Sequence, residues 1–175
     1  ANCIGQRELK QAYLLRGTDR SVRIRVTDNM AFFTIKLGTG LTRSEFEYEI
    51  PQDEANDMIE EANLPCLHKT RYYIQNGTDT WELDVFHGAL DGLLIAELEL
   101  ESEDQTFDKP SWLGQEVTFD PAYLNSNLID RYLTAKIDFP PFSGLGHVGS
   151  MIDSFHISID GTFCAPFIFI TVGGA

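Results

Sequence analysis

The segment Arg43-Ser-Glu-Phe-Glu-Tyr-Glu-Ile50 places a charged residue at every second position, with mostly apolar residues between. Successive side chains of a β-strand point to opposite faces, so this alternation predicts a strand with one charged and one apolar face. The same pattern recurs in short segments separated by turn residues, which is typical of an antiparallel barrel or sandwich. Eight strands are predicted in this way: Leu9–Leu15, Val22–Val26, Phe32–Leu37, Ser44–Ile50, His68–Ile74, Thr80–Phe86, Leu93–Glu101 and Gln115–Phe119.

Two helices are expected among these strands, which makes the predicted fold mainly β with a few flanking helices. In Pro51–Leu64, apolar residues recur at helical spacing and acidic residues occupy the other face. This pattern predicts an amphipathic helix. A second helix is predicted to begin at Asp120-Pro121, because Asp favours the N-cap position and Pro the first helical position.

The character of the chain changes after about residue 130. Pro and Gly punctuate a loop-like stretch, followed by the strand-like segments Ser154–Ile159 and Ala165–Val172. We therefore expect one domain at residues 1–130 and a C-terminal appendage at residues 131–175.

Composition limits the partners and the compartment. The 175 residues carry a formal net charge of −14, which disfavours binding to nucleic acid or to an anionic membrane surface. Cys3, Cys66 and Cys164 match neither a disulfide framework nor a zinc motif, so a reducing cytoplasm is expected. The most apolar run, Phe163–Val172, is too short for a membrane helix.

The polar face of each predicted strand carries charge of one dominant sign. The basic faces contain Arg23 and Arg25, Lys36, and Lys69 and Arg71, whereas the acidic faces contain Glu45 and Glu47, Glu82 and Asp84, Glu97 and Glu99, and Glu116. Two architectures fit this pattern. The charged faces can be solvated over an apolar core, or they can line the lumen of a closed barrel whose apolar side faces outward.

A charged lumen of this kind suits a polyphosphate. Arg and Lys side chains neutralise phosphoryl oxygens, and Arg does so with two parallel hydrogen bonds. The carboxylates suit Mg²⁺ or Mn²⁺, which use one or two of them together with oxygens of the substrate. Attack by water on such a bound substrate would make the protein a phosphohydrolase.

A series of motifs in this order resembles the CYTH family, also called triphosphate tunnel metalloenzymes, over about residues 11–128. The motifs are Ser21-Val-Arg-Ile-Arg25, Phe33-Thr-Ile-Lys36, Arg43-Ser-Glu-Phe-Glu-Tyr-Glu-Ile-Pro51, Lys69-Thr-Arg-Tyr72, Trp81-Glu-Leu-Asp-Val-Phe86, Gly92-Leu-Leu-Ile-Ala-Glu-Leu-Glu-Leu100, Pro110-Ser-Trp-Leu-Gly-Gln-Glu-Val-Thr118 and Asn125-Ser-Asn-Leu128. The bacterial members that the chain is similar to are inorganic triphosphatases or, more loosely, adenylate cyclases.

The resemblance implies an antiparallel, eight-stranded closed barrel that binds a triphosphate with Mg²⁺ or Mn²⁺. It implies that the substrate is held by Arg23, Arg25, Lys36, Arg43, Lys69 and Arg71. It also implies that the metal is held by Glu82, Asp84, Glu97 and Glu99, with Glu45, Glu47 and Glu116 as weaker candidates.

The chain departs from the family at its start. The family's first strand carries Glu-X-Glu-X-Lys, whereas this chain begins Ala1-Asn-Cys-Ile-Gly-Gln-Arg-Glu-Leu-Lys10 and has no counterpart of the signature lysine. The catalytic residue is therefore left unassigned. The late strand-like segments are candidates to complete the barrel in its place.

Four functions are compatible with these residues. The leading hypothesis is metal-dependent hydrolysis of inorganic triphosphate or of a nucleoside or organic triphosphate. The alternatives are a non-catalytic binder of triphosphate or polyphosphate, an adenylate cyclase-like protein, and a β-sandwich with a protein partner. The apolar outer faces of the strands also allow a homodimer.

Overall fold

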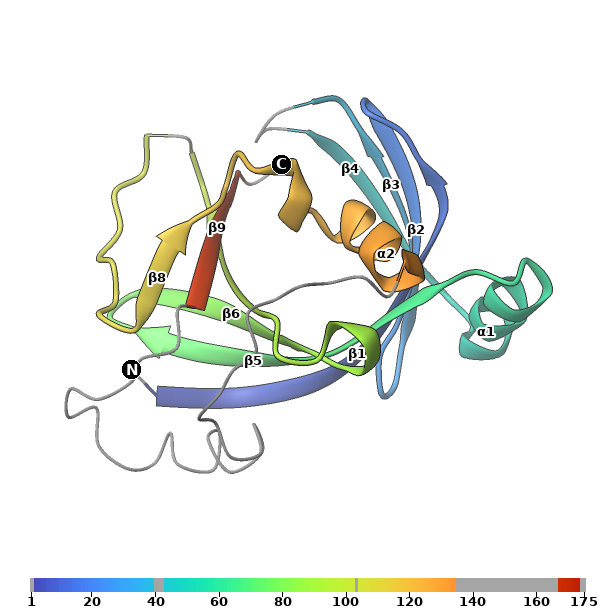
Figure 1. The fold of residues 1–175 in the computed structure, drawn as a ribbon, viewed down its shortest axis with the longest axis horizontal. Coiled ribbons are helices and arrows are strands. Elements are labelled where there is room, and N and C mark those ends of the chain that lie inside the picture. Colours follow the sequence, from blue (N-terminus) through green and yellow to red (C-terminus); the bar gives the residue numbers. More distant parts are fainter. Residues whose placement is uncertain (1, 40–42, 103, 135–166, 174–175) are drawn as a thin grey trace.

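The computed structural model describes residues 2–39, 43–102, 104–134 and 167–173. These residues form a single curved sheet of nine strands in the order β4-β3-β2-β1-β5-β6-β7-β9-β8 (Figure 1). The strands are β1 (Asn2–Arg16), β2 (Arg20–Val26), β3 (Ala31–Leu37), β4 (Ser44–Ile50), β5 (Cys66–Asn76), β6 (Asp79–Phe86), β7 (Leu94–Leu100), β8 (Leu113–Glu116) and β9 (Phe167–Gly173). The expectation of a mainly β fold with few helices is confirmed.

The sheet differs from the expected closed barrel of eight antiparallel strands. In the described part of the chain, the sheet has nine strands and is not closed, and β4 and β8 are its two edges. Neighbouring pairs from β4 through β7 are antiparallel, but β9 pairs in parallel with both β7 and β8. The additional strand corresponds to the predicted segment Ala165–Val172, whereas Ser154–Ile159 lies outside the described residues.

The predicted strands are all present, and the largest boundary error concerns β1. This strand begins at Asn2 instead of Leu9, because residues 2–12 pair with β5 over nearly its whole length. At the other end of the domain, β8 ends at Glu116, and Val117 donates its amide hydrogen to the carbonyl of Phe169.

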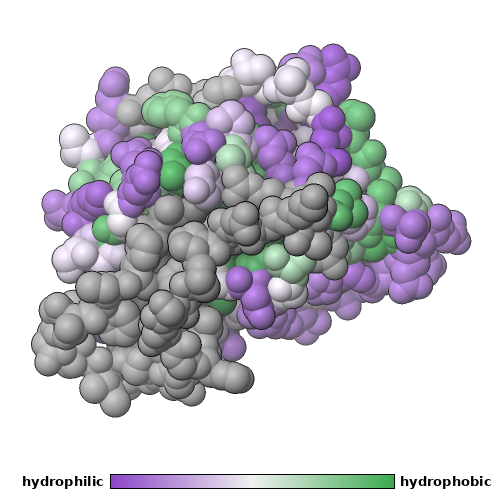
Figure 2. All heavy atoms as spheres, in the orientation of Figure 1, coloured by the Kyte–Doolittle hydropathy of each residue, from purple (hydrophilic) through white to green (hydrophobic). Residues whose placement is uncertain are grey.

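Among the described residues, two α-helices and two short 3₁₀ helices accompany the sheet. The predicted amphipathic helix is α1 (Gln52–Glu61), whose Ala55 and Ile59 are buried against Ile24 and Ala31. Its acidic residues form the hydrophilic surface at the right-hand end of the molecule in Figure 2. Within the described residues, no helix is long and apolar enough to cross a membrane.

The second predicted helix is divided into two pieces. Asp120 caps the 3₁₀ helix η2 (Pro121–Tyr123) by accepting a hydrogen bond from the amide of Ala122. The α-helix α2 (Asn125–Thr134) begins only after Leu124, which has an extended backbone. A further 3₁₀ helix, η1 (Gly88–Leu90), was not predicted.

The apolar residues form clusters on both sides of the sheet. On its outer side, Trp81 packs edge to face against Phe107, Trp112 and Phe169. On its inner side, Leu128 and Ile129 of α2 pack in one cluster with Phe86 and Ile95. Helix α2 therefore fills one part of the concave side of the sheet, and the charged strand faces line the remainder (Figure 1).

Candidate functional site

The concave side of the sheet contains a cavity of about 590 Å³. Its walls come from β1 to β7, from the segment Tyr123–Ser126 at the start of α2, and from Ile170 of β9. Seven of the 13 Lys and Arg residues of the chain line it: Arg7, Arg23, Arg25, Lys36, Arg43, Lys69 and Arg71. The acidic lining consists of Glu45, Glu47, Glu82, Glu97 and Glu99, so the cavity is basic within an acidic protein.

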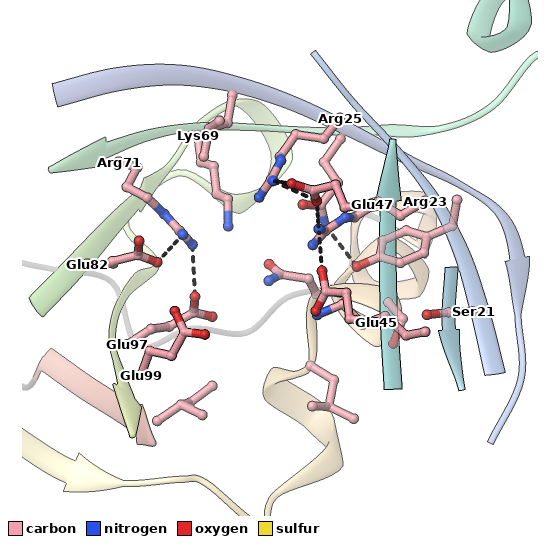
Figure 3. A pocket seen from close by; sticks show the side chains of 18 of the residues that line it. Ser21, Arg23, Arg25, Glu45, Glu47, Lys69, Arg71, Glu82, Glu97 and Glu99 are labelled. Carbon is pink, nitrogen blue, oxygen red and sulfur yellow. Dashed lines mark hydrogen bonds and ion pairs between the residues drawn. The ribbon is translucent and has the colours of Figure 1, made fainter. Parts of the chain in front are cut away.

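Arg23, Arg25 and Lys36, which we call the β2–β3 cations, are held by two glutamates of β4. Figure 3 shows Arg23 and Arg25 beside Glu45 and Glu47. Glu47 accepts hydrogen bonds from Arg25 through both carboxylate oxygens at 2.9 Å, and from Thr34 at 2.9 Å. Glu45 contacts Lys36 Nζ at 2.7 Å. The antiparallel register explains these contacts, because Thr34 is the partner of both Arg23 and Glu47 and Lys36 is the partner of Glu45.

Lys69 and Arg71, which we call the β5 cations, surround a fully buried carboxylate. Arg71 donates from Nε and Nη2 to the two oxygens of Asp84, each at 2.7 Å, and Lys69 also donates to Asp84. A further Arg71 hydrogen bond reaches Glu97 at 2.8 Å, and Arg71 pairs with Glu82 as well. In Figure 3, Glu82 and Glu97 lie across the cavity from Glu45 and Glu47.

Two arginine nitrogens in the cavity wall have no acceptor in the part of the chain that the structure describes. The Nε atoms of Arg23 and Arg25 are buried and form no hydrogen bond with any described residue. A buried N–H without an acceptor costs free energy, typically about 1–3 kcal/mol. An anion in the cavity would provide these acceptors, so the lining favours an anionic ligand.

Burial and neighbouring charges shift several pKa values in the site. Burial lowers the pKa of Lys36 and of Arg25, and the charge of Arg23 lowers both further. Burial opposes ionisation of Glu45, but its hydrogen bond and charge interaction with Lys36 outweigh this effect and lower its pKa. Burial raises the pKa of Glu82, although Arg71 opposes the shift. At Lys36 and Arg25, burial and the repulsion from Arg23 thus outweigh the attraction of the glutamate partners, which favours binding of a further anion beside these two cations.

The carboxylates on the β6–β7 side are the candidates for holding a metal ion. Glu97 and Glu99 line the cavity from β7, and Glu82 is the register partner of Glu97 on β6. Among the described residues, no three His, Cys, Asp or Glu side chains are grouped closely enough to hold a metal by themselves. Mg²⁺ commonly uses one or two carboxylates, waters and phosphate oxygens, so this donor set fits a metal that arrives with a phosphate chain.

The structure gathers most of the predicted site residues and leaves two of them apart. All six predicted substrate-binding cations line the cavity, as do Glu45, Glu47, Glu82, Glu97 and Glu99. Asp84 lies behind the lining with both oxygens bonded to Lys69 and Arg71. Glu116 is exposed on β8, where it accepts a hydrogen bond from Thr118, and it does not line the cavity.

Some lining residues were not predicted from the sequence. Arg7, Leu9, Gln11 and Tyr13 alternate along β1 and all line the cavity. The period-two pattern of β1 was visible, but a neutral Gln and Tyr gave no charge signal comparable to that of the other strands. The residues Tyr123 and Asn125 reach the cavity only because η2 and α2 fold across the concave side.

The fold and the site together define a class of protein: a curved, mainly β protein whose charged strand faces line an interior cavity. The chain belongs to the CYTH family, because the CYTH domain matches residues 10–132. It is 48% identical over 122 residues to an inorganic triphosphatase of Acetivibrio thermocellus, which covers 69% of this chain and 78% of that protein. It is also 38% identical over 125 residues to an inorganic triphosphatase of Nitrosomonas europaea, covering 69% of this chain and 82% of that one.

A solved structure supports the same relationship. The crystal structure of an inorganic triphosphatase matches with a TM-score of 0.54 and 35% sequence identity. The match covers 71% of this chain and 83% of the solved chain. The expected membership of the CYTH family is confirmed.

Proposed function

We propose that this protein hydrolyses inorganic triphosphate in the cavity on the concave side of the sheet. The observation that carries the proposal is the collection of seven basic side chains in one interior cavity of an otherwise acidic chain. The buried N–H groups of Arg23 and Arg25 support it, because phosphoryl oxygens would supply their acceptors. The inorganic triphosphatases similar to this chain support the choice of reaction.

In the proposed reaction, water attacks a terminal phosphorus atom of the triphosphate. A P–O bond forms to the water oxygen and the bridging P–O bond breaks, which yields pyrophosphate and phosphate and releases the water proton to solvent. The β2–β3 cations bind the phosphate chain from one side and the β5 cations from the other. Phosphoryl transfer depends mainly on positioning and on stabilisation of developing charge, and these cations provide both.

The carboxylates have two different roles in this proposal. Glu97 and Glu99, with Glu82 beside them, would hold Mg²⁺ or Mn²⁺, which would supply further neutralisation of the phosphoryl oxygens. Asp84 is assigned instead to positioning Lys69 and Arg71, because both of its oxygens are already bonded to these cations. Glu45 and Glu47 position the β2–β3 cations in the same way.

Several expectations stay predictions. These are the identity of the metal, a cytoplasmic location, a homodimer, the lack of nucleic-acid and membrane partners, the domain boundary near residue 130, and closure of the sheet into a barrel.

Phosphate release from inorganic triphosphate tests the proposal. We expect release by the full chain that requires Mg²⁺ or Mn²⁺, and a fall in kcat/KM of about 10- to 100-fold for Lys36→Ala, since a charge-assisted contact is lost. Lys10→Ala is the matched control, because β1 alternation directs Lys10 away from the cavity. Tight binding of triphosphate without any release would instead support the non-catalytic binder.

A further inference from the structure

Arg7 is a cation of the cavity wall that lies outside the part of the chain with family similarity. It precedes residues 10–132, which match the CYTH domain, and none of the predicted strands contains it. Its side chain is half-buried and lines the cavity from the first half of β1. Membership of the family therefore does not explain why this position is basic.

The inner face of β1 runs alongside a row of cations. Four successive inner positions of β1 each have a cation as register partner on β2 or β5. The pairs are Tyr13 with Arg23, Gln11 with Arg25, Leu9 with Lys69, and Arg7 with Arg71. Arg7 thus stands at the end of the row, where it adds a second guanidinium group beside Arg71.

β1 extends past the end of β2 at this point. β2 pairs with residues 10–16 of β1, whereas β5 pairs with residues 2–12 (Figure 1). Within the described sheet, Arg7 therefore has a neighbouring strand only on its β5 side. This position at the margin of the cavity wall suits a contact with the end of a ligand that the other cations hold.

Arg7 differs from Arg71 in its lack of a carboxylate partner. The guanidinium group of Arg71 contacts Asp84, Glu82 and Glu97. Arg7 forms no hydrogen bond or ion pair with any residue that the structure describes. Like charges at directly opposed positions of neighbouring strands repel each other, and a guanidinium group carries five N–H donors. An anion shared by Arg7 and Arg71 would offset this repulsion and accept hydrogen bonds from the free donors.

We propose that Arg7 is a specificity-determining residue that binds the terminal phosphoryl group of triphosphate together with Arg71. This inference rests on the proposed function. Triphosphate has one phosphoryl group more than its product pyrophosphate. The β2–β3 cations and Lys69 hold the two phosphoryl groups that both molecules share, and the third one reaches Arg7. Arg7 therefore favours binding of the substrate over binding of the product that must leave.

Calorimetric titration of the full chain with Mg²⁺ compares two poorly hydrolysed analogues, imidotriphosphate and imidodiphosphate. For Arg7→Gln, we expect Kd of imidotriphosphate to rise about 10-fold, as for loss of a hydrogen bond to a charged group. Kd of imidodiphosphate should change by less than about twofold, because this shorter ligand does not reach Arg7. Arg20→Gln is the matched control, since it removes the same charge from an exposed position on β2 outside the cavity lining.

The outcomes separate this proposal from the proposed function. Equal weakening of both analogues by Arg7→Gln, or an equal effect of Arg20→Gln, would indicate a general effect of charge and would overturn the specificity role. An unchanged Kd of imidotriphosphate for Arg7→Gln would overturn the contact itself. In these cases the wild-type chain still binds imidotriphosphate, so the proposed function stands, whereas no binding by the wild-type chain would overturn both. Thermal unfolding of each variant verifies that the measured protein is folded.

Discussion

Asp84 is fully buried, and every hydrogen bond found for it comes from Lys69 or Arg71. This carboxylate fixes the positions of the Lys69 and Arg71 side chains, although Asp84 does not itself line the cavity. Burying three charged groups together requires each to be neutralised, since an uncompensated buried charge is costly. The family resemblance implied Asp84 as a metal ligand, but we propose that it supports the phosphate-binding side chains Lys69 and Arg71.

Asp84→Asn is expected to destabilise the protein strongly. Removing one partner of a buried ion pair typically costs about 3–5 kcal/mol, because the remaining charge stays buried without compensation. Urea unfolding measures this change, and Asp104→Asn, at an exposed position, serves as the control with little expected effect. A loss below about 1 kcal/mol, the range of exposed pairs, would show that Asp84 does not hold the two cations.

Asp84 should also make the stability of the protein depend on pH. Burial opposes ionisation of Asp84, but Lys69 and Arg71 outweigh it and hold its pKa below the ordinary value. Its contribution to stability is therefore complete above the unfolded pKa of about 4 and is lost as the pH falls through the lower folded pKa. Unfolding measured from neutral pH downward should show a steeper loss below about pH 4 for the wild type than for Asp84→Asn. Parallel curves would contradict this.

At the scale of elements, β1 and α2 shape the cavity more than the sequence indicated. Strand alternation located all eight predicted strands, because period two depends only on which residues face the core. The parallel pairing of β9 with β7 and β8 could not be predicted in this way, because alternation does not indicate which strands lie next to each other in the sheet. Likewise, the Asp120-Pro121 signal located a helix start correctly but did not show that Leu124 interrupts the helix.

The position of α2 depends on a contact with the end of β1. Arg16 donates to the carbonyl of Ser126 at 2.9 Å and to Asp130 at 2.7 Å. Both side chains of the ion pair are partly or largely exposed, so Arg16→Ala should cost at most about 1 kcal/mol of stability. We nevertheless expect faster amide hydrogen exchange in residues 125–134, because α2 loses an anchor. Arg20→Ala, whose ion pair is with neighbouring Asp19, is the control and should leave α2 unchanged.

At the scale of the whole molecule, the distribution of charge was predictable and the closure of the sheet was not. The five cations predicted from the basic strand faces, and Arg43, which the family resemblance added, all meet in one cavity, because residues of one parity on a curved sheet converge on its concave side. Asp84 follows the same parity, but its short side chain stays below the longer Lys69 and Arg71. Whether a sheet closes depends on strand number and stagger, which a pattern of faces does not contain.

The open edge of the sheet at β4 should show fast amide hydrogen exchange. Among the described residues, β4 pairs with β3 alone, whereas β5 has strands on both sides. Amides of Ser44–Ile50 that point away from β3 should therefore exchange much faster than those of Cys66–Asn76. Equal protection of the two strands, followed by mass spectrometry or NMR, would show that the barrel closes at β4.

Hydrolysis of inorganic triphosphate in the basic cavity is the function that we propose for this protein. The most direct measurement is a ³¹P NMR time course of triphosphate with the full chain, first in chelator and then after addition of excess Mg²⁺. We predict stable triphosphate signals before the addition, and their conversion into equal amounts of pyrophosphate and phosphate after it. Triphosphate that persists after addition of metal, with a protein shown to be folded, would contradict the account.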